Sequence, residues 1–320
     1  MGESLLRVRI AILMSTYNGE KWVQQQLDSI LKQTGVDSCI YIRDDGSADN
    51  TLSIIGSYSE SNRVFITGDD RRKRLGAGDS FMELVKYAQS TLADQYDYFA
   101  FADQDDYWQP DKLISAVELM QGMEEPCLYF SKKTIVDAKL RLMNEEDYIP
   151  YSNQVLHSIG QCNAFGCTFV FNRRLLGCIQ RKTVGRGYHD AWIFRLSVWC
   201  GFRIFYDTNS HILYRQHGQN AAGPVRKKIW YRQLLFLSTW RNQIDRFFCK
   251  NLNDVVLMQR EIYEKYADAF PNDNMELLKL VVGYRYNIRD RYHLMKHPVF
   301  KTNGNRDYVR WMFRIAMNRM

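Results

Sequence analysis

Short apolar runs alternate with longer amphipathic segments along the first two thirds of this chain. The runs are rich in β-prone residues and predict strands at 9–14, 39–42, 64–67 and 97–102. Between the strands, apolar residues recur at helical spacing in three segments: Trp22 to Leu31, Asn50 to Ser57 and Ser80 to Thr91. This β-α-β-α order predicts an α/β fold, Rossmann-like, with a mostly parallel central sheet and helices on both of its faces.

The last third of the chain has a different pattern, with helical spacing throughout and no strand signal. Apolar residues recur at this spacing in two segments: Trp230, Leu234, Leu237, Trp240 and Ile244, then Val255, Met258, Ile262 and Tyr266. Near the end, Arg306, Arg310 and Arg314 form a basic row one helical turn apart. We therefore expect a catalytic or binding domain at 1–223 and a helical extension at 224–320.

The strongest chemical signal is Asp103-Gln104-Asp105-Asp106, directly after the apolar run from Tyr98 to Ala102. These carboxylates are expected at the carboxyl edge of the sheet, where open α/β sheets bind ligands. Carboxylates this close repel one another unless a positive charge lies between them. A hard divalent cation bridging a diphosphate is the commonest such charge, so the stretch predicts a site for a metal and a phosphorylated ligand.

The ends of the first two strands also carry polar residues suited to a nucleotide. No Gly-x-Gly-x-x-Gly follows the first strand, which removes the best support for a dehydrogenase. Ser15 and Thr16 instead offer hydroxyls near a helix N-terminus, and Asp45 can accept a hydrogen bond from a pyrimidine ring or a ribose hydroxyl. Locally, the segment around Asp45 is equally an ordinary turn and helix-cap signal, and that interpretation stays open.

Composition and charge narrow the setting. With 320 residues, 46% of them apolar, the chain can bury a large core, and its seven scattered cysteines indicate free thiols in a reducing cytosol. No apolar segment is long enough for an export signal or a membrane-spanning helix.

The charge is distributed unevenly along the chain. Residues 1–223 hold 24 basic against 27 acidic residues, whereas 224–320 hold 19 against 9. The basic extension is therefore expected either to bind an anionic membrane surface or to pack, against the catalytic domain or against a second subunit in a homodimer. Binding to nucleic acid is disfavoured, because no nucleic-acid-binding motif accompanies the basic charge.

Six segments in order resemble the family-2 glycosyltransferases of the GT-A fold, and the later ones resemble bacterial rhamnosyltransferases within that family. The six segments are 12–19, 43–51, 103–108, 166–173, 188–192 and 214–220. The resemblance extends over residues 8–223. It implies an enzyme that transfers a sugar from a nucleoside-diphosphate donor, using Mg²⁺ or Mn²⁺ as cofactor.

The resemblance also assigns roles to particular residues on the donor side. It implies that Thr16, Tyr17 and Asp45 hold the nucleoside, in agreement with the chemistry above. The Asp-x-Asp motif of the family falls on Asp103-Gln104-Asp105, with Asp105 as metal ligand and Asp103 facing the ribose or sugar. Asp106 has two interpretations: it supports this site from behind, or it caps a helix predicted from Asp111 to Met120.

On the acceptor side, the resemblance implies an inverting displacement in which Asp190 is the catalytic base. Alternatively, Asp190 only caps the apolar helix that follows it. His189 stands where many relatives carry an acid, so its role is open. His217 lies in a late loop from which some enzymes of this fold complete the metal site or hold the diphosphate, and Arg215 is expected to counter phosphate charge.

Together these observations predict a cytoplasmic enzyme, peripheral at the inner face of the plasma membrane. The favoured reaction moves L-rhamnose from dTDP-rhamnose to a hydroxyl of a lipid-linked cell-surface glycan. A UDP-glucose or UDP-galactose enzyme is the alternative, because Asp45 suits uracil and thymine alike. Two alternatives belong to other classes. A nucleotide-sugar-binding module without turnover is disfavoured by the presence of Asp103, Asp105 and Asp190. A nucleotidyltransferase is disfavoured because this sequence has no Gly-rich, Lys-containing signature after the first strand.

Overall fold

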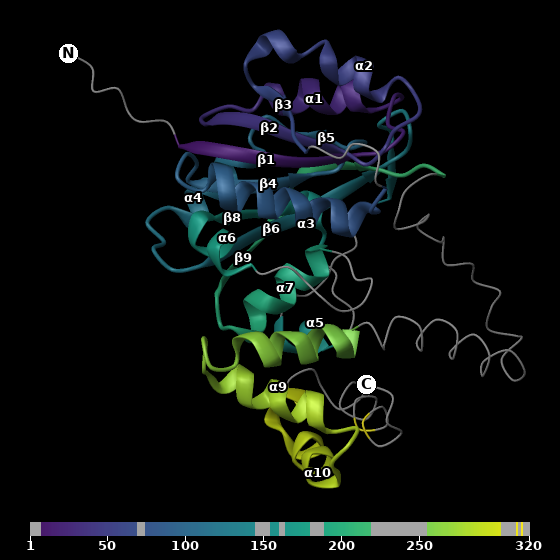
Figure 1. The fold of residues 1–320 in the computed structure, drawn as a ribbon. Helices are drawn as coiled ribbons and strands as arrows, with labels where there is room; N and C mark the ends of the chain where they lie inside the picture. Colours follow the sequence, from purple (N-terminus) through teal and green to yellow (C-terminus); the bar gives the residue numbers. More distant parts are fainter. Residues whose placement is uncertain are drawn as a thin grey trace, which may run out of the picture.

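A computed structural model describes the chain at residues 8–68, 74–144, 154–159, 164–179, 189–218 and 255–301, with 312 and 315. Near the N-terminus, strands β1 to β4 form a parallel sheet (Figure 1). Their bounds are Arg9–Thr16 for β1, Asp37–Asp44 for β2, Val64–Ile66 for β3 and Tyr98–Ala102 for β4. β1 lies between β2 and β4 and pairs in parallel with both. The carboxyl ends of these strands consequently meet at one edge, as the sequence predicted.

Strands from later in the chain extend this sheet in mixed directions. They are β5 (Tyr107–Trp108), β6 (Cys127–Val136), β7 (Leu142–Asn144), β8 (Val170–Asn172) and β9 (Arg203–Arg215). The order across the sheet is β3-β2-β1-β4-β8-β6-β9-β5, with β7 paired to β6. The two-residue β5 follows the acidic stretch at once and pairs antiparallel with the end of β9. This pairing brings residues 103–106, here named the acidic loop, beside the loop that follows β9.

Helices cover both faces of the sheet, and β1 alternates between the two cores. Ile10, Ile12 and Met14 pack into one core, whereas Ala11 and Leu13 belong to the other. The α-helices are α1 (Val23–Leu31), α2 (Thr51–Gly56), α3 (Ala77–Tyr87), α4 (Lys112–Met120), α5 (Gln154–Ile159), α6 (Arg173–Cys178) and α7 (His189–Trp199). Short 3₁₀ turns lie at Ser59–Ser61, Gly166–Thr168 and Pro298–Lys301, and a π turn at Ala88–Leu92 continues α3. This arrangement confirms the predicted α/β class.

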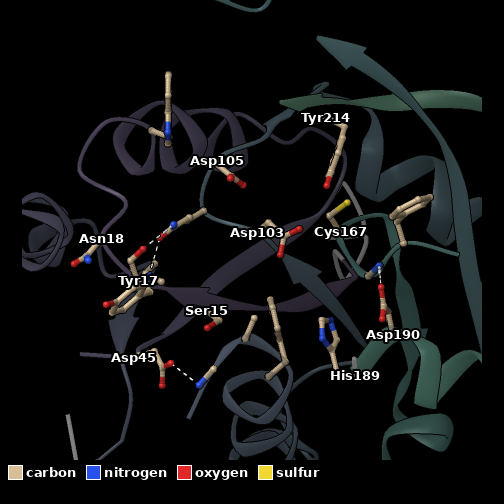
Figure 2. A pocket seen from close by; sticks show the side chains of 18 of the residues that line it. Ser15, Tyr17, Asn18, Asp45, Asp103, Asp105, Cys167, His189, Asp190 and Tyr214 are labelled. Carbon is tan, nitrogen blue, oxygen red and sulfur yellow. Dashed lines mark hydrogen bonds between the residues drawn. The ribbon is translucent and has the colours of Figure 1, made fainter. Parts of the chain in front are cut away.

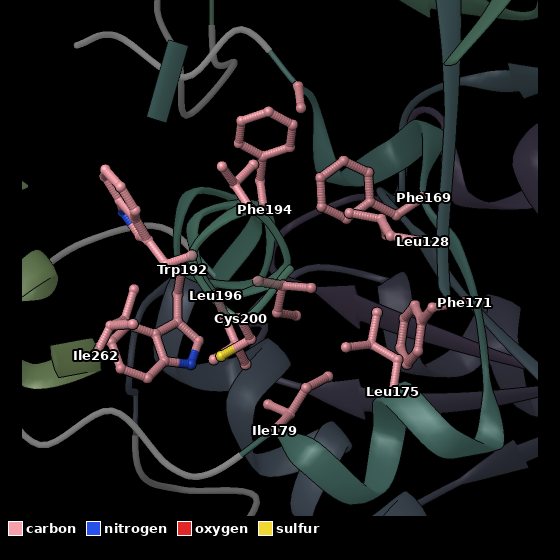
Figure 3. Packing of buried hydrophobic residues seen from close by; sticks show 14 of the residues in the cluster. Leu128, Phe169, Phe171, Leu175, Ile179, Trp192, Phe194, Leu196, Cys200 and Ile262 are labelled. Carbon is pink, nitrogen blue, oxygen red and sulfur yellow. The ribbon is translucent and has the colours of Figure 1, made fainter. Parts of the chain in front are cut away.

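Helices at the C-terminal end of the described chain lie beneath the sheet domain in the view of Figure 1. They are the helix at 255–266, α9 (Asp273–Gly283) and α10 (Ile288–Lys296). α9 packs on α7, and α10 packs on α9. Met258, Ile262 and Tyr266 of the first helix are buried in the same core as Trp192 of α7, which confirms their predicted helical face. Figure 3 shows Ile262 beside Trp192. None of the described helices is long and apolar enough to cross a membrane.

Several predictions fall outside the described residues. They are the domain boundary at 223/224, the helical face carrying Trp230, Leu234, Leu237, Trp240 and Ile244, and the basic row of Arg306, Arg310 and Arg314. Among the described cysteines, Cys39, Cys127, Cys167, Cys178 and Cys200 are free thiols. These five agree with the predicted absence of a disulfide framework.

Candidate active site

One cavity of 440 Å³ opens at the carboxyl edge of β1 and β4, beside the start of α7 (Figure 2). In the view of Figure 2, Tyr17 and Asp45 lie on the left, Asp190 on the right, and Asp103 between them. The predicted site residues that line the cavity are Ser15, Thr16, Tyr17, Asp45, Asp103, Asp105, Asp190 and His217. Residues from five separate parts of the sequence thus share one space, and Arg215 is the predicted site residue that does not line it.

The turn after β1 is held by side chains from other segments. The Thr16 hydroxyl donates to Asp44 at 2.9 Å and is buried, and the Ser15 and Ser80 hydroxyls lie 2.6 Å apart. Gln104 clamps the backbone of Tyr17: its Oε1 accepts from the Tyr17 N–H at 2.8 Å, and its Nε2 donates to the Tyr17 carbonyl at 3.0 Å. The acidic loop and the β1 turn are therefore fixed to each other through one amide side chain.

Asp45 lines the cavity, and its carboxylate holds a neighbouring segment. It accepts hydrogen bonds from the backbone N–H groups of Leu75 at 2.8 Å and Gly76 at 2.7 Å, and it pairs with Arg43 at 2.7 Å. The turn role that the sequence left open for this segment belongs to Asp44, which accepts from the backbone N–H groups of the turn. Asp45 therefore fixes the backbone that leads into α3, next to the space expected for a base.

Asp103 occupies the middle of the site and has an altered acidity. Burial, followed by the neighbouring carboxylates of Asp105 and Asp190, raises its pKa to about 7, while Lys133 opposes the shift. An unusual pKa in a cavity is typical of functional sites, because converging acids are costly unless a ligand uses them. Asp103 and Asp190 line the same cavity, so the acidic loop and α7 converge in space.

Asp105 and His217 meet at the cavity wall although they lie far apart in the sequence. The Nε2 atom of His217 lies 2.8 Å from Oδ2 of Asp105. Trp22, at the N-cap of α1, stacks on the His217 ring with centroids 5.3 Å apart and planes at 19°. The structure thus brings together the two residues that the sequence proposed as metal ligands, and it adds an indole that fixes the imidazole.

Arg215 lies behind this wall and does not face the cavity. Its side-chain nitrogens donate to the carbonyls of Asp105 and Ala138, both at 2.7 Å, and to Oε1 of Gln25 at 2.5 Å. Its guanidinium also lies over the Trp22 ring, 4.6 Å from the centroid. With these nitrogens bonded to protein acceptors, Arg215 supports the loop, and the phosphate contact expected of it stays a prediction.

Asp106 is fully buried, and its predicted role as a helix cap is wrong. The N-cap position of α4 is Asp111, and the Oδ1 atom of Asp106 instead accepts from the backbone N–H of Arg215 at 3.1 Å. Burial and its acidic neighbours raise the pKa of Asp106 well above its usual range. Asp106 supports the site from behind by joining the acidic loop to the end of β9, which is the other interpretation that the sequence allowed.

Asp190 lies in the first turn of α7 at the opposite side of the cavity. Its carboxylate accepts from the backbone N–H of Gly166 at 3.2 Å and of Ala191 at 2.6 Å. Gly166 permits this approach, because a Cβ there would lie 2.5 Å from Nε2 of His189 and 3.2 Å from Cβ of Asp190. Two backbone donors orient the carboxylate while it still lines the cavity, which suits a general base.

His189, whose role the sequence left open, is packed between aromatic rings. It stacks on Phe81 with centroids 4.0 Å apart and meets the edge of Phe101 at 4.8 Å. It is buried, although it also borders the cavity. We infer that His189 fixes the start of α7, and therefore the position of Asp190, by packing.

The donor atoms at the wall fit a divalent cation. Asp103 and Asp105 offer carboxylate oxygens and His217 offers an imidazole nitrogen, all bordering the same cavity. Oxygen ligands suit Mg²⁺ and Mn²⁺, and an imidazole favours Mn²⁺ of the two. A second group of potential ligand atoms, from Asp103, Asp106 and Cys167, lies within 4.8 Å of one another. Burial keeps the pKa of the Cys167 thiol high, so the Asp105 and His217 side fits a hard cation better.

Comparison with known proteins agrees with this geometry. Residues 11–179 match the model of the glycosyl transferase family 2. The chain belongs to this family. It is 31% identical over 293 residues to the dTDP-rhamnosyl transferase RfbG of Shigella flexneri, covering 86% of this chain and 90% of the relative. It is 30% identical over 201 residues to an Escherichia coli protein named UDP-Glc:alpha-D-GlcNAc-diphosphoundecaprenol beta-1,3-glucosyltransferase WfgD, covering 60% of this chain and 74% of that one.

Solved structures share the fold of this glycosyltransferase. Residues 1–349 of TarS from S. aureus superimpose with a TM-score of 0.57 at 13% identity, covering 97% of this chain and 92% of that one. The same TarS fragment in complex with UDP-GlcNAc gives a TM-score of 0.55 at 14% identity. The likeness confirms the GT-A architecture that the motifs predicted.

Three residues of this glycosyltransferase site were missed as site residues by the sequence reasoning. Trp22 was assigned only to an apolar helix face, although its position at the edge of that face was a signal for another role. Gln104 was passed over as the variable residue between two acids, and its amide proves to be the clamp on Tyr17. Gly166 stood within a recognised segment, and only the packing of His189 shows why a side chain has no room there.

Proposed function

We propose that this glycosyltransferase is a metal-dependent, inverting hexosyltransferase that moves L-rhamnose from dTDP-rhamnose to a hydroxyl of a lipid-linked bacterial cell-surface glycan. The relation to RfbG over most of both chains supports the rhamnosyl donor. The name of WfgD, which specifies a diphosphoundecaprenol acceptor, supports a lipid-linked acceptor. The same relative supports the rival donor, a UDP-hexose such as UDP-glucose or UDP-galactose.

One observation carries the proposal: the cavity is bordered by Asp105 and His217 on one side and by Asp190 on another. A displacement at an anomeric carbon needs a group that accepts the acceptor proton and an environment that stabilises the departing diphosphate. Asp190 is the carboxylate for the first task, because two backbone N–H groups hold it and it lines the cavity. Asp103, Asp105 and His217 border the space for the second.

In the proposed step, the acceptor oxygen attacks the anomeric carbon from the side of Asp190. The O–H proton passes to the Asp190 carboxylate as the new C–O bond forms. The bond from the anomeric carbon to the diphosphate breaks, and its electron pair leaves with the nucleoside diphosphate. Attack opposite to the leaving group inverts the anomeric configuration, and no covalent sugar–enzyme intermediate is required.

The donor's nucleoside would lie along the β1 turn and Asp45. Tyr17 lines this part of the cavity, and Arg74 lies over its ring at 4.1 Å. Asp105, His217 and Asp103 would hold Mg²⁺ or Mn²⁺. When bound there, the cation would neutralise charge on the departing diphosphate.

The two parts of the chain are also proposed to have different functions. Residues 1–223 would bind both substrates, and residues 224–320 would contact the inner face of the plasma membrane or a second subunit. A cytoplasmic protein held peripherally at that face would meet a lipid-linked acceptor directly. A binding module without turnover is disfavoured, because Asp190 has an oriented carboxylate and a cavity in front of it.

A donor panel tests the proposal. Purified protein is incubated with dTDP-rhamnose, UDP-glucose or UDP-galactose, a lipid-pyrophosphate glycan acceptor and Mn²⁺ or Mg²⁺, and nucleoside diphosphate release is followed. We expect acceptor-dependent release from dTDP-rhamnose that EDTA abolishes and Mn²⁺ restores. Turnover that EDTA leaves unchanged would overturn the metal role. Preference for a UDP-hexose would replace the rhamnosyl donor, and binding without turnover of any donor would contradict the enzyme.

A further inference from the structure

The C-terminal end of the described chain exposes large apolar side chains close together. Tyr286 is 74% exposed, Ile288 80% and Tyr292 54%, all within seven residues at the turn into α10. Ile288 and Tyr292 are one helical turn apart, so they lie on the same face of α10. Water-exposed apolar groups this close together usually mark a contact surface.

Basic residues share this face of α10. Arg289 and Lys296 are exposed, and helical geometry at about 100° per residue places them beside Ile288 and Tyr292. Lys296 lies over the Tyr292 ring, 4.2 Å from its centroid. His293 is exposed on the same side. The face therefore combines apolar anchors with cations.

The acid of α10 and its apolar packing residue point elsewhere. Leu294 is fully buried against the rest of the protein. The Asp290 carboxylate lies against Gly283 at the end of α9, where a Cβ would collide with it. The exposed face consequently carries no carboxylate from its own helix. Beside it, Arg260 of the helix at 255–266 lies over the Tyr286 ring, 5.6 Å from its centroid, and pairs with Glu264 at 3.5 Å, so the neighbouring carboxylate is matched by a cation. Aromatic and aliphatic side chains beside cations are the composition of helices that lie in the headgroup region of anionic membranes.

We propose that the face formed by Tyr286, Ile288, Arg289, Tyr292 and Lys296, here named the α10 face, binds the surface of an anionic lipid bilayer. Tyrosine rings suit the headgroup level, and each cation near an anionic surface strengthens binding by about fivefold. The proposal rests on the membrane contact proposed above for residues 224–320 and locates it. It does not depend on the donor chemistry, because lipid binding is measured without sugar transfer. It places the membrane contact on described residues outside the cavity.

Vesicle co-sedimentation of the full chain tests the α10 face. Vesicles of phosphatidylcholine with and without phosphatidylglycerol are compared, at low and high salt. We expect binding to the anionic vesicles that salt weakens. The double variant Arg289→Gln/Lys296→Gln should bind roughly 25-fold more weakly, from about fivefold per cation, and Ile288→Ser/Tyr292→Ser should also lose binding.

A matched control comes from β7, where Leu142 is 65% and Met143 51% exposed. Leu142→Ser/Met143→Ser should bind vesicles as the wild type does, and circular dichroism should show all three variants folded. Equal vesicle binding by the α10 variants and the wild type, or no binding of the wild type to anionic vesicles, would overturn the proposal. So would a dimer in light scattering that only the α10 variants dissociate while vesicle binding is unchanged, because the face would then be a subunit contact.

Discussion

The two sides of the cavity are held in place by different physical means. On the β9 side, comprising Asp105, Arg215 and His217, polar contacts join residues more than 100 positions apart, with Asp105 and His217 separated by 112. On the α7 side, comprising Gly166, His189 and Asp190, close packing sets the geometry, with His189 between two phenylalanines. Polar contacts can exchange partners when a charged ligand arrives, whereas packing holds a base at a fixed distance from its substrate.

Removing the charge of Asp105 should have the largest effect on the β9 side. Asp105→Asn keeps the shape but weakens the proposed cation site, so we expect sugar transfer to fall by about 10³-fold, which is about 4 kcal/mol of transition-state stabilisation. Steady-state kinetics with titrated Mn²⁺ measure this. Asp94→Asn, at an exposed acid outside the cavity, is the matched control and should behave as the wild type. Unchanged transfer and Mn²⁺ dependence in Asp105→Asn would remove Asp105 from the metal site.

Arg215 should matter for stability. Arg215→Gln removes the donors to Asp105, Ala138 and Gln25 from a buried site, and we expect a loss of about 3 kcal/mol in the free energy of unfolding. Urea denaturation measures the change. Arg203→Gln, at an exposed position of the same strand, should cost little. If both variants unfold at the same urea concentration, the polar network does not hold the β9 side.

A single methyl group should disturb the α7 side. Gly166→Ala would place a Cβ 2.5 Å from His189, so α7 must shift and we expect kcat to fall by about 10²-fold. Gly177→Ala is the control, because a Cβ there meets nothing within 4 Å. Nucleoside diphosphate affinity, measured by calorimetry, should stay unchanged in both variants. An affinity loss in Gly166→Ala that exceeds its kcat loss would show that the two sides are not separate.

Trp22 should have the smallest effect, because it acts through His217. Trp22→Ala removes the stacked ring, and supporting contacts of metal ligands are worth at least about tenfold in metal affinity. Calorimetric titration of Mn²⁺ in the presence of dTDP measures it, and Trp22→Phe should recover most of the loss because it restores a ring. Equal Mn²⁺ affinity in Trp22→Ala and the wild type would mean that His217 is fixed without the stack.

The same contrast explains what the sequence could predict. Apolar runs and helical spacing are local signals, so the first four strands, the helices between them and the acids at their ends followed from the sequence. The contacts of Arg215 and Asp106 depend on the antiparallel pairing of β5 with β9, which no local pattern encodes. For this reason Asp106 was expected at a helix cap, and the contacts that Arg215 makes within the protein were not predicted. Trp22 likewise fits a helix face by local pattern alone, because its contact with His217 joins residues that are far apart in the sequence.

Asp190 is proposed to serve bond formation and not donor binding. The most direct measurement is made on Asp190→Asn, comparing single-turnover sugar transfer with calorimetric dTDP affinity in Mn²⁺. Because the amide cannot take the acceptor proton, transfer should fall by about 10² to 10⁴-fold, while dTDP affinity stays close to that of the wild type. Wild-type transfer by Asp190→Asn, or a loss of dTDP affinity that matches the loss of transfer, would contradict the account.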